Sequence, residues 1–229
     1  MMQGFTPGLD IRIAGQDFTA FAQRALYWPK NGLLMIADLH LGKSDTFRAS
    51  GISVPYAVQQ HDLARLDALL AAVRPRALVV LGDFVHGSLV ARQTLQAWQA
   101  LRQAHGATRF ILTRGNHDRS LAAQHGLMDE VLAELCIDGV RMAHEGYEAA
   151  RGVPGTSHWL HISGHHHPVF RARSWHKALP AMVHDGQRLV LPAFSEFTAG
   201  LRIHGPDSQV WVFSSETGTG YEGLVVQVR

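Results

Sequence analysis

Three short apolar runs, each followed at once by a polar motif, constrain the fold of this chain more than any other feature. The runs are Leu33–Ala37 (LLMIA), Ala77–Leu81 (ALVVL) and Arg109–Thr113 (RFILT). Apolar runs without alternation are typical of strands that are buried on both faces. Residues 58–73 and 88–104, which lie between these runs, have helical spacing. This alternation predicts a parallel sheet with the polar motifs at the carboxyl ends of its strands, where α/β proteins bind ligands.

The second half of the chain is predicted to be rich in strands. We expect strands at 131–137, 140–144, 159–163, 188–191, 210–213 and 224–227, in addition to one at 20–28. The glycine-rich segment 218–223 (GTGYEG) is typical of a late hairpin. We therefore expect a single domain over residues 1–229, with two packed sheets and helices outside them.

Composition narrows the classes of site that this fold can carry. The chain has 229 residues, of which 46% are hydrophobic, so it can bury a sizeable core. Its 15 histidines stand out, because histidine is the commonest metal ligand. A lone cysteine, Cys136, excludes an internal disulfide, a cysteine-clustered zinc site and an iron–sulfur centre. Any metal must therefore be held by nitrogen and oxygen.

Charge and hydropathy set expectations about partners and location. The formal net charge of +2 is no nucleic-acid signature by itself. The N-terminus lacks the basic start and apolar core of a signal peptide, and the apolar runs are too short to span a bilayer. We therefore expect a cytoplasmic protein with no membrane association.

Four polar motifs and one isolated histidine follow the predicted strands in order. They are Asp38-Leu39-His40, Gly82-Asp83, Gly115-Asn116-His117-Asp118, Gly164-His165-His166-His167 and His144. Taken singly, each has an ordinary explanation: a chance pair, a turn, a helix cap, a solvated loop or a structural histidine. Their order, their position at strand ends and their number of ligands together indicate one site.

Spacing and ligand type indicate a metal centre with two ions. In an extended segment residues i and i+2 face the same way, so Asp38 can share an ion with His40, and His165 with His167. Aspartate, asparagine and histidine suit manganese, iron or zinc. Seven such ligands are too many for one ion, and they suit two ions that share a carboxylate, as in two-metal hydrolases.

The ordered motifs from about residue 33 to 168 resemble the calcineurin-like metallophosphoesterase pattern. The resemblance implies a four-layer αββα sandwich with two mixed sheets and a dinuclear centre. It implies Asp38, His40, Asp83 and His167 as ligands of one metal. It implies Asp83, Asn116, His144 and His165 as ligands of the other, with Asp83 bridging the two. It places His117 beside the site without a bond to metal.

A narrower resemblance links the chain to the ligase-associated DNA damage response endonuclease PdeM family. It rests on ADLHLGK at 37–43, TFRASGISVP at 46–55, RGNHD and LPAFSEFTAG at 191–200. It implies a bacterial DNA endonuclease that works beside a DNA ligase and a DEXH helicase. The chain departs from the wider pattern at His86, where many members have aspartate, and at Glu145, where many have glycine. His158 and His161 compete with His144 as the lone histidine, although His161 is expected in the core.

These features predict metal-assisted hydrolysis of phosphoesters by two divalent ions, Mn²⁺ first, with Fe or Zn as alternatives. His117 is predicted to protonate the leaving group and Asp118 to orient it. The basic residues expected to contact substrate phosphates are Lys43, Arg48, Arg114 and Arg119. Four aromatic side chains could stack on bases, although core packing is the favoured reading for each: Trp159, Trp175, Phe170 and Phe194. The alternatives are a small-nucleotide phosphodiesterase or phosphatase, and a scaffold that has lost catalysis.

Overall fold

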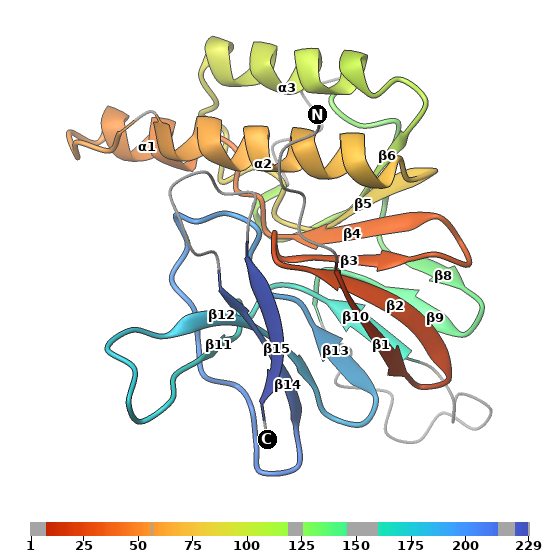
Figure 1. The fold of residues 1–229 in the computed structure, drawn as a ribbon. Helices are drawn as coiled ribbons and strands as arrows, with labels where there is room; N and C mark the ends of the chain where they lie inside the picture. The colour runs from red at the N-terminus through yellow and green to blue at the C-terminus, as the bar shows by residue number, and fades with distance from the viewer. Residues whose placement is uncertain (1–7, 56, 119–125, 146–159, 215–222, 229) are drawn as a thin grey trace, which may run out of the picture.

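A computed structural model describes residues 8–55, 57–118, 126–145, 160–214 and 223–228. Its first sheet follows the order of the chain, from β1 to β7 (Figure 1). The strands are β1 (Leu9–Ile13), β2 (Gln16–Phe21), β3 (Ala25–Trp28), β4 (Leu33–Ala37), β5 (Ala77–Leu81), β6 (Arg109–Thr113) and β7 (Glu130–Leu132). The first four are antiparallel neighbours, and β4 to β7 are parallel. The predicted parallel strands are therefore confirmed.

The second sheet has the order β15-β14-β12-β13-β10-β9-β8, with β11 paired to β12. Its strands are β8 (Leu135–Ile137), β9 (Val140–Met142), β10 (Leu160–Ser163), β11 (Val169–Phe170), β12 (Leu179–His184), β13 (Arg188–Val190), β14 (Gln209–Ser214) and β15 (Leu224–Val228). β10 pairs in parallel with β9 and β13, and the other pairs among the described strands of this sheet are antiparallel. Both sheets are thus mixed, as expected.

The two cores of the molecule lie on opposite faces of the first sheet. On β4, Leu34 and Ile36 face the helices, whereas Leu33 and Met35 face the second sheet. The helices α1 (Lys43–Ala49), α2 (Ala57–Val73) and α3 (Arg92–Ala104) lie over the outer face of the first sheet (Figure 1). Burial on both faces explains why the apolar runs of β4 and β5 show no alternation.

A smaller apolar cluster covers the outer face of the second sheet. Ala181 and Val212 lie at its centre, and Phe170, Trp175 and Ile203 pack against them. Across the described residues this cover consists of β11 and loops, so the helical fourth layer expected over the second sheet is not found there. None of the described helices has the length and apolar character needed to cross a bilayer.

Several predicted boundaries need correction. The strand expected at 20–28 is a hairpin, because Arg24 adopts a φ of 63° and its N–H donates to the carbonyl of Phe21 at 3.0 Å. The strand expected at 131–137 is two strands, β7 and β8, which belong to different sheets. The helix expected from residue 88 begins at Arg92. The sequence did not predict α1, β1, β11 or β12, and most of the predicted hairpin at 218–223 lies outside the described residues.

Candidate metal centre

The predicted ligands gather where the carboxyl ends of strands from both sheets meet. Asp38 follows β4 and Asp83 follows β5 in the first sheet, whereas His144 follows β9 and His165 follows β10 in the second. The loops are joined directly: the N–H of His165 donates to Asp38 Oδ2 at 3.0 Å. Residues more than a hundred positions apart in the chain thus form one site.

Six of the predicted ligands form two compact groups. Asp38, His40 and His167 make up the first group, and Asp83, His144 and His165 the second; within each, the ligand atoms lie within 4.8 Å of one another. The groups adjoin, since His144 Nδ1 lies 3.6 Å from Asp38 Oδ1. This division is the one that the family resemblance implies.

The backbone at these positions corrects the spacing argument. Five of the six ligands have positive φ: Asp38 (54°), His40 (49°), Asp83 (45°), His165 (68°) and His167 (46°). Such values are uncommon outside glycine and cluster at functional sites. The segments are therefore not extended, and His165 and His167 point into different groups instead of sharing one ion. The spacing argument was wrong for this pair.

The glycines of the motifs provide room for the ligands. A Cβ on Gly82 would overlap the ring of His144, and one on Gly115 would overlap the carboxylate of Asp83. Gly82 also has a φ of 69°. The glycines of these two motifs are thus required by the close packing of their backbone against ligand side chains.

The first group presents buried donors that suit a divalent cation. Asp38 and His40 are 0% and 4% exposed. Neither ring nitrogen of His40, nor Asp38 Oδ1, has a hydrogen-bond partner among the described residues. Burial, and secondarily the charge of Lys43, lowers the pKa of His40 to about 2, so this ligand is neutral near pH 7. Unpartnered buried nitrogen and oxygen atoms fit a metal site.

His167 completes the first group. Its Nδ1 donates to the carbonyl of Ala199 at 3.2 Å, and its Nε2 lies 3.4 Å from Asp38 Oδ1. Burial lowers the pKa of His167, but the Asp38 carboxylate outweighs this effect and the pKa ends above its ordinary value. The backbone contact orients the ring so that Nε2 faces the group.

The second group has the same arrangement. His144 donates from Nδ1 to the carbonyl of Leu81 at 3.1 Å, so its Nε2 faces Asp83 Oδ1 at 3.4 Å. Nδ1 of His165 lies 3.1 Å from this Nε2. Two ring nitrogens and a carboxylate thus converge on one point, as ligands of a single ion do. The sharing of Asp83 between two ions stays a prediction.

Asn116 lies beside the second group and is held by a residue that the sequence singled out only as a departure. Its Nδ2 donates to Glu145 Oε1 at 2.5 Å. This bond lowers the pKa of Glu145. It also fixes the amide so that Oδ1, the atom able to bind metal, faces away from Glu145. The position of Glu145 directly after the predicted ligand His144 indicated that it lies near the site. Its hydrogen bond to Asn116 could not be predicted from the sequence.

His117 lies at the exposed rim of the site. Its Nδ1 donates to the carbonyl of His86 at 2.8 Å, and its Nε2 lies 3.9 Å from Asp83 Oδ2. The ring of His86 stacks on it with centroids 5.1 Å apart. Burial, then the charges of Lys43 and His117, lowers the pKa of His86. His86 therefore orients His117 through its backbone and its ring.

Asp118 does not orient His117, contrary to the sequence interpretation. It is buried, and its two carboxylate oxygens accept backbone N–H groups of Gly115 at 2.8 Å and Val85 at 3.1 Å. Burial raises its pKa, while these two bonds oppose the rise. Asp118 holds together the loops that carry Asn116 and Asp83, which is a structural role.

The predicted phosphate-binding residues occupy different settings. Lys43 lies half-buried beside the first group, with Nζ 3.3 Å from Thr198 Oγ1. Burial lowers its pKa, and the carboxylates of Asp38 and Asp83 oppose this. Arg48 is turned into the protein, where it pairs with Asp45 at 2.5 Å and donates to the carbonyl of Val54. Arg114 is exposed, and Arg119 lies outside the described residues.

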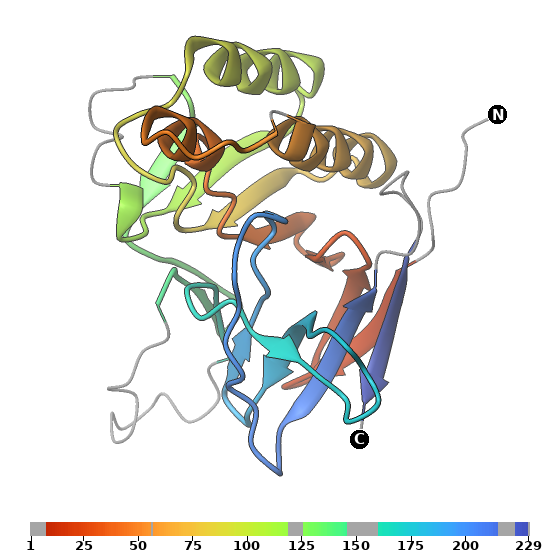
Figure 2. The ribbon, with the colours of Figure 1, turned by 90° about the vertical axis from the view of Figure 1, so that its left-hand side faces the viewer.

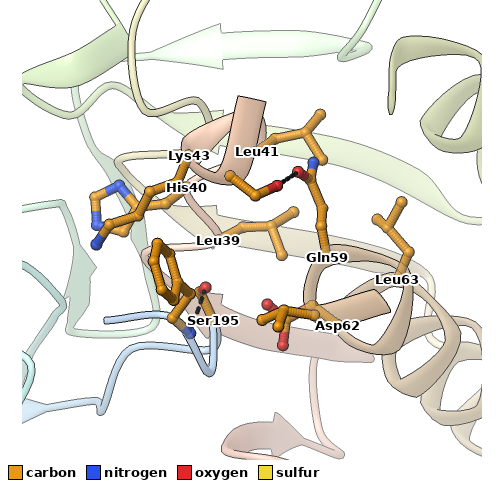
Figure 3. A pocket seen from close by; sticks show the side chains of 11 residues that line it. Leu39, His40, Leu41, Lys43, Gln59, Asp62, Leu63 and Ser195 are labelled. Carbon is orange, nitrogen blue, oxygen red and sulfur yellow. Dashed lines mark hydrogen bonds between the residues drawn. The ribbon is translucent and has the colours of Figure 1, made fainter. Parts of the chain in front are cut away.

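A small pocket separates the first group from the helices (Figure 3). His40 and Lys43 lie at one end of it, and Gln59 and Leu63 at the other. Ser44 donates to Gln59 Oε1 at 2.7 Å across its wall. Side chains of α1 and α2 therefore line the same pocket as the loop that carries His40.

The segment 193–199, which we call the strap, is a part of the site that ligand spacing did not reveal. Its Phe194 N–H donates to the carbonyl of Ala37 at 2.7 Å, and its Ala199 carbonyl orients His167. Arg65, only 2% exposed, binds the strap through Glu196 Oε1 at 2.8 Å and the carbonyl of Phe194. The strap thus contacts both helix α2, through Arg65, and the loop that carries His167, through the carbonyl of Ala199.

The other candidates lie away from the centre. His161 is buried in β10, on the face opposite Leu160 and Ile162. Phe194 is fully buried, and Phe170 and Trp175 pack on the second sheet, as the core interpretation expected. His158 and Trp159 lie outside the described residues.

Two adjoining groups of buried acidic and histidine ligands, at the meeting edge of a two-sheet sandwich, define a metal-dependent hydrolase. Residues 33–194 match the calcineurin-like phosphoesterase family. The chain therefore belongs to the calcineurin-like phosphoesterase family and is a metal-dependent phosphoesterase.

Solved structures extend this comparison. The nuclease MPE of Pseudomonas putida is 30% identical, covers 96% of this chain and 100% of its own, and superposes with a TM-score of 0.77. Yfce, a phosphoesterase from E. coli, is 17% identical over 86% of this chain and 97% of its own, with a TM-score of 0.43. A protein from Aquifex aeolicus, AQ665, is 20% identical over 62% of this chain and 81% of its own, with a TM-score of 0.41. No curated protein matches the chain.

Proposed function

We propose that this chain is a dinuclear metal-dependent phosphodiesterase that cleaves DNA. The observation that carries the proposal is the pair of adjoining groups, each with two histidines and one aspartate, beside the exposed ring of His117. We assign Asp38, His40 and His167 to one ion, and Asn116, His144 and His165 to the other, with Asp83 shared. Mn²⁺ is the proposed metal at both positions.

When bound by these residues, two divalent ions would supply Lewis-acid polarisation of the phosphate and would ease the ionisation of water near pH 7. The residues do the positioning. Leu81 and Ala199 hold His144 and His167 through their carbonyls, which keeps Nε2 of each ring toward its group. Lys43, half-buried beside the first group, adds positive charge where a substrate phosphate would lie.

His117 is proposed to donate a proton to the leaving oxygen. Its Nδ1–H is occupied by the carbonyl of His86, so the proton is held at Nε2, on the side of Asp83. This places Nε2, 3.9 Å from Asp83 Oδ2, toward the metal groups where the leaving oxygen of a substrate would lie.

The choice of DNA rests on two resemblances. The Pseudomonas putida protein that is 30% identical is described as a nuclease. The motifs ADLHLGK, RGNHD and LPAFSEFTAG resemble the PdeM family, from which we propose a role in bacterial DNA repair beside a ligase and a DEXH helicase in the cytoplasm.

The test compares substrates and one variant. Protein from which a chelator has removed all metal should be inactive. Added Mn²⁺ should restore its hydrolysis of bis(p-nitrophenyl) phosphate and of labelled DNA. His117→Ala should lose about 10²–10⁴-fold in kcat while its metal content is unchanged. Activity on mononucleotides or cyclic nucleotides without cleavage of DNA would favour the small-nucleotide alternative. No turnover with any divalent ion would favour a scaffold.

A further inference from the structure

Arg24 has a backbone conformation that glycine or asparagine adopts at lower cost. It lies in the turn between β2 and β3 with a φ of 63°. Positive φ values are uncommon for residues such as arginine, and they persist only where the surrounding structure imposes them. A turn that needed only this φ would favour glycine or asparagine. The arginine at this position therefore points to a role for its side chain outside the turn.

The side chain of Arg24 leaves the hairpin and binds the backbone of the strap. Its Nη1 donates to three successive carbonyls, those of Ala193, Phe194 and Ser195, at 3.4, 3.5 and 3.1 Å. Burial, then the charge of Arg65, lowers the pKa of Arg24 to about 10, so the guanidinium still carries its charge near pH 7. Three successive carbonyls can converge on one nitrogen only in a restricted backbone conformation. Arg24 thus fixes the conformation in which the strap begins.

The beginning of the strap is bonded to the loop that carries Asp38. The N–H of Phe194 donates to the carbonyl of Ala37 at 2.7 Å, and that of Ser195 to the carbonyl of Asp38 at 3.4 Å. Figure 2 shows the blue loop that contains the strap rising from the second sheet toward α1 and α2. The residues held by Arg24 are therefore the ones that contact the backbone of a predicted metal ligand.

The end of the strap contacts the other side of the first metal group. The carbonyl of Ala199 accepts the Nδ1–H of His167 at 3.2 Å. Just before it, Thr198 Oγ1 lies 3.3 Å from Nζ of Lys43. Among the described residues, no hydrogen bond joins the strap to the second group, Asp83, His144 and His165. The strap is thus a support of the first group alone.

We propose that Arg24 is a positioning residue for the first metal ion and acts on its ligands through the strap. This inference rests on the proposed function, because it takes Asp38, His40 and His167 as ligands of an ion. Direct hydrogen-bond partners of metal ligands typically change metal affinity by about 10–100-fold when they are removed. Arg24 acts one contact further away, so we expect an effect of about three- to tenfold.

The test uses a variant that removes the guanidinium without straining the turn. Arg24→Gly does both, because glycine adopts a positive φ without steric cost. The matched control is Arg74→Gly, since Arg74 is an exposed arginine with a φ of 49°. Arg74 lies between α2 and the amino end of β5, at the opposite edge of the sheet from the metal groups. Arg24→Gln keeps an amide donor on a shorter, neutral side chain.

Isothermal titration calorimetry with Mn²⁺ is carried out in two backgrounds, each of which lacks one metal group. In His144→Ala, which disables the second group, Arg24→Gly should raise the Kd of the remaining ion about three- to tenfold. Arg24→Gln should raise it less, and Arg74→Gly should leave it within twofold. In His40→Ala, which disables the first group, Arg24→Gly should leave the Kd unchanged. An unchanged Kd in the first background, or an equal rise in both, would overturn the proposal.

Two further measurements separate positioning from a general loss of structure. The Mn²⁺ concentration that gives half-maximal hydrolysis of bis(p-nitrophenyl) phosphate should rise by the same factor as the Kd. If Arg24→Gly melts earlier than Arg74→Gly, the titrations are repeated well below its melting temperature, and a Kd that returns to normal there would overturn the proposal.

The inference and the proposed function can fail separately. If metal affinity depends on Arg24 while no divalent ion supports hydrolysis, the proposed function fails and this inference stands. If hydrolysis requires metal while Arg24→Gly binds Mn²⁺ normally, only this inference is overturned.

Discussion

At the scale of single residues, the notable departure from the family pattern is Glu145. Its carboxylate accepts a bond from the amide of Asn116 and thereby decides which atom of Asn116 faces the second group. Groups behind a metal ligand typically change metal affinity by 10–100-fold when they are removed. Glu145 therefore acts on a predicted ligand through the Asn116 amide.

We expect Glu145→Ala to weaken Mn²⁺ binding at the second group by about tenfold, because the Asn116 amide is then free to rotate. Glu145→Gln, which keeps an oxygen acceptor, should bind close to normally. Isothermal titration calorimetry of the chelated protein measures both. Glu134→Ala, an exposed acid paired with Arg141, is the matched control. Normal binding by Glu145→Ala would contradict the role, and equal weakening in Glu145→Gln would assign it to charge alone.

The sequence was informative about ligands and less so about what surrounds them. Asp38, Asp83 and His165 could be predicted because they follow buried strands either directly or after one glycine. Their positive φ values could not, since backbone strain of this kind is imposed by tertiary contacts. The error about His165 and His167 followed from that. The carbonyls of Leu81 and Ala199 leave no side-chain signal at all.

At the scale of elements, the strap shows how a segment without regular structure can hold two layers together. Asp62 and Arg65 on α2 reach it, and Arg24 donates to three successive carbonyls, those of residues 193–195. Burial raises the pKa of Glu196, but Arg65, then His61 and Arg24, outweigh it and the pKa ends below its ordinary value. The ionised form of Glu196 therefore stabilises the fold.

We expect Glu196→Gln to lower the free energy of unfolding by about 1–2 kcal/mol at neutral pH. Since the folded pKa is depressed, this contribution is present above the unfolded value of about 4.3 and is lost as the pH falls through the folded pKa. The difference between the two proteins should thus shrink in acid. Urea denaturation at a series of pH values measures it.

Glu134→Gln is the control, because its exposed pair with Arg141 is worth about 0–1 kcal/mol. A difference in the free energy of unfolding between Glu196→Gln and the unsubstituted chain that persists unchanged in acid would contradict the assigned ionisation.

The sequence predicted some elements better than others. The strands β4, β5 and β6 are buried on both faces, and their apolar runs predicted them correctly. The hairpin of β2 and β3 read as one strand, because its turn contains no glycine, proline or asparagine.

At the scale of the whole molecule, the metal centre is where the two sheets are joined through side chains. Each group draws ligands from both sheets, so bound ions would add a further link between layers already joined by the apolar core and by hydrogen bonds such as His165 N–H to Asp38. The two-sheet plan was anticipated from the strand-rich second half of the chain, whereas the loop cover of the second sheet was not. This cover consists of the short β11 and the irregular segments 171–178 and 202–204, which have no periodicity that a sequence pattern could detect.

We expect Mn²⁺ to raise the melting temperature of the chelated protein. An ion at 100 times its Kd adds about 2.7 kcal/mol, which corresponds to roughly 5–10 °C for a chain of this size. Differential scanning calorimetry measures the shift, and Asp38→Asn should reduce it. The gain should fall as the pH drops, because His167, whose pKa is raised, must lose its proton to bind metal. No shift with any divalent ion would contradict a metal centre that joins the sheets.

The order of the first sheet matches the order of synthesis, because β1 to β7 are neighbours in sequence as in space. Each new strand can therefore join the growing edge as it leaves the ribosome. The first metal group cannot form in this way, because it needs His167 in addition to Asp38 and His40. His167 is synthesised more than a hundred residues after them. A nascent chain thus gains its scaffold early and its hydrolytic centre late, and a product truncated before His167 would carry no complete metal centre.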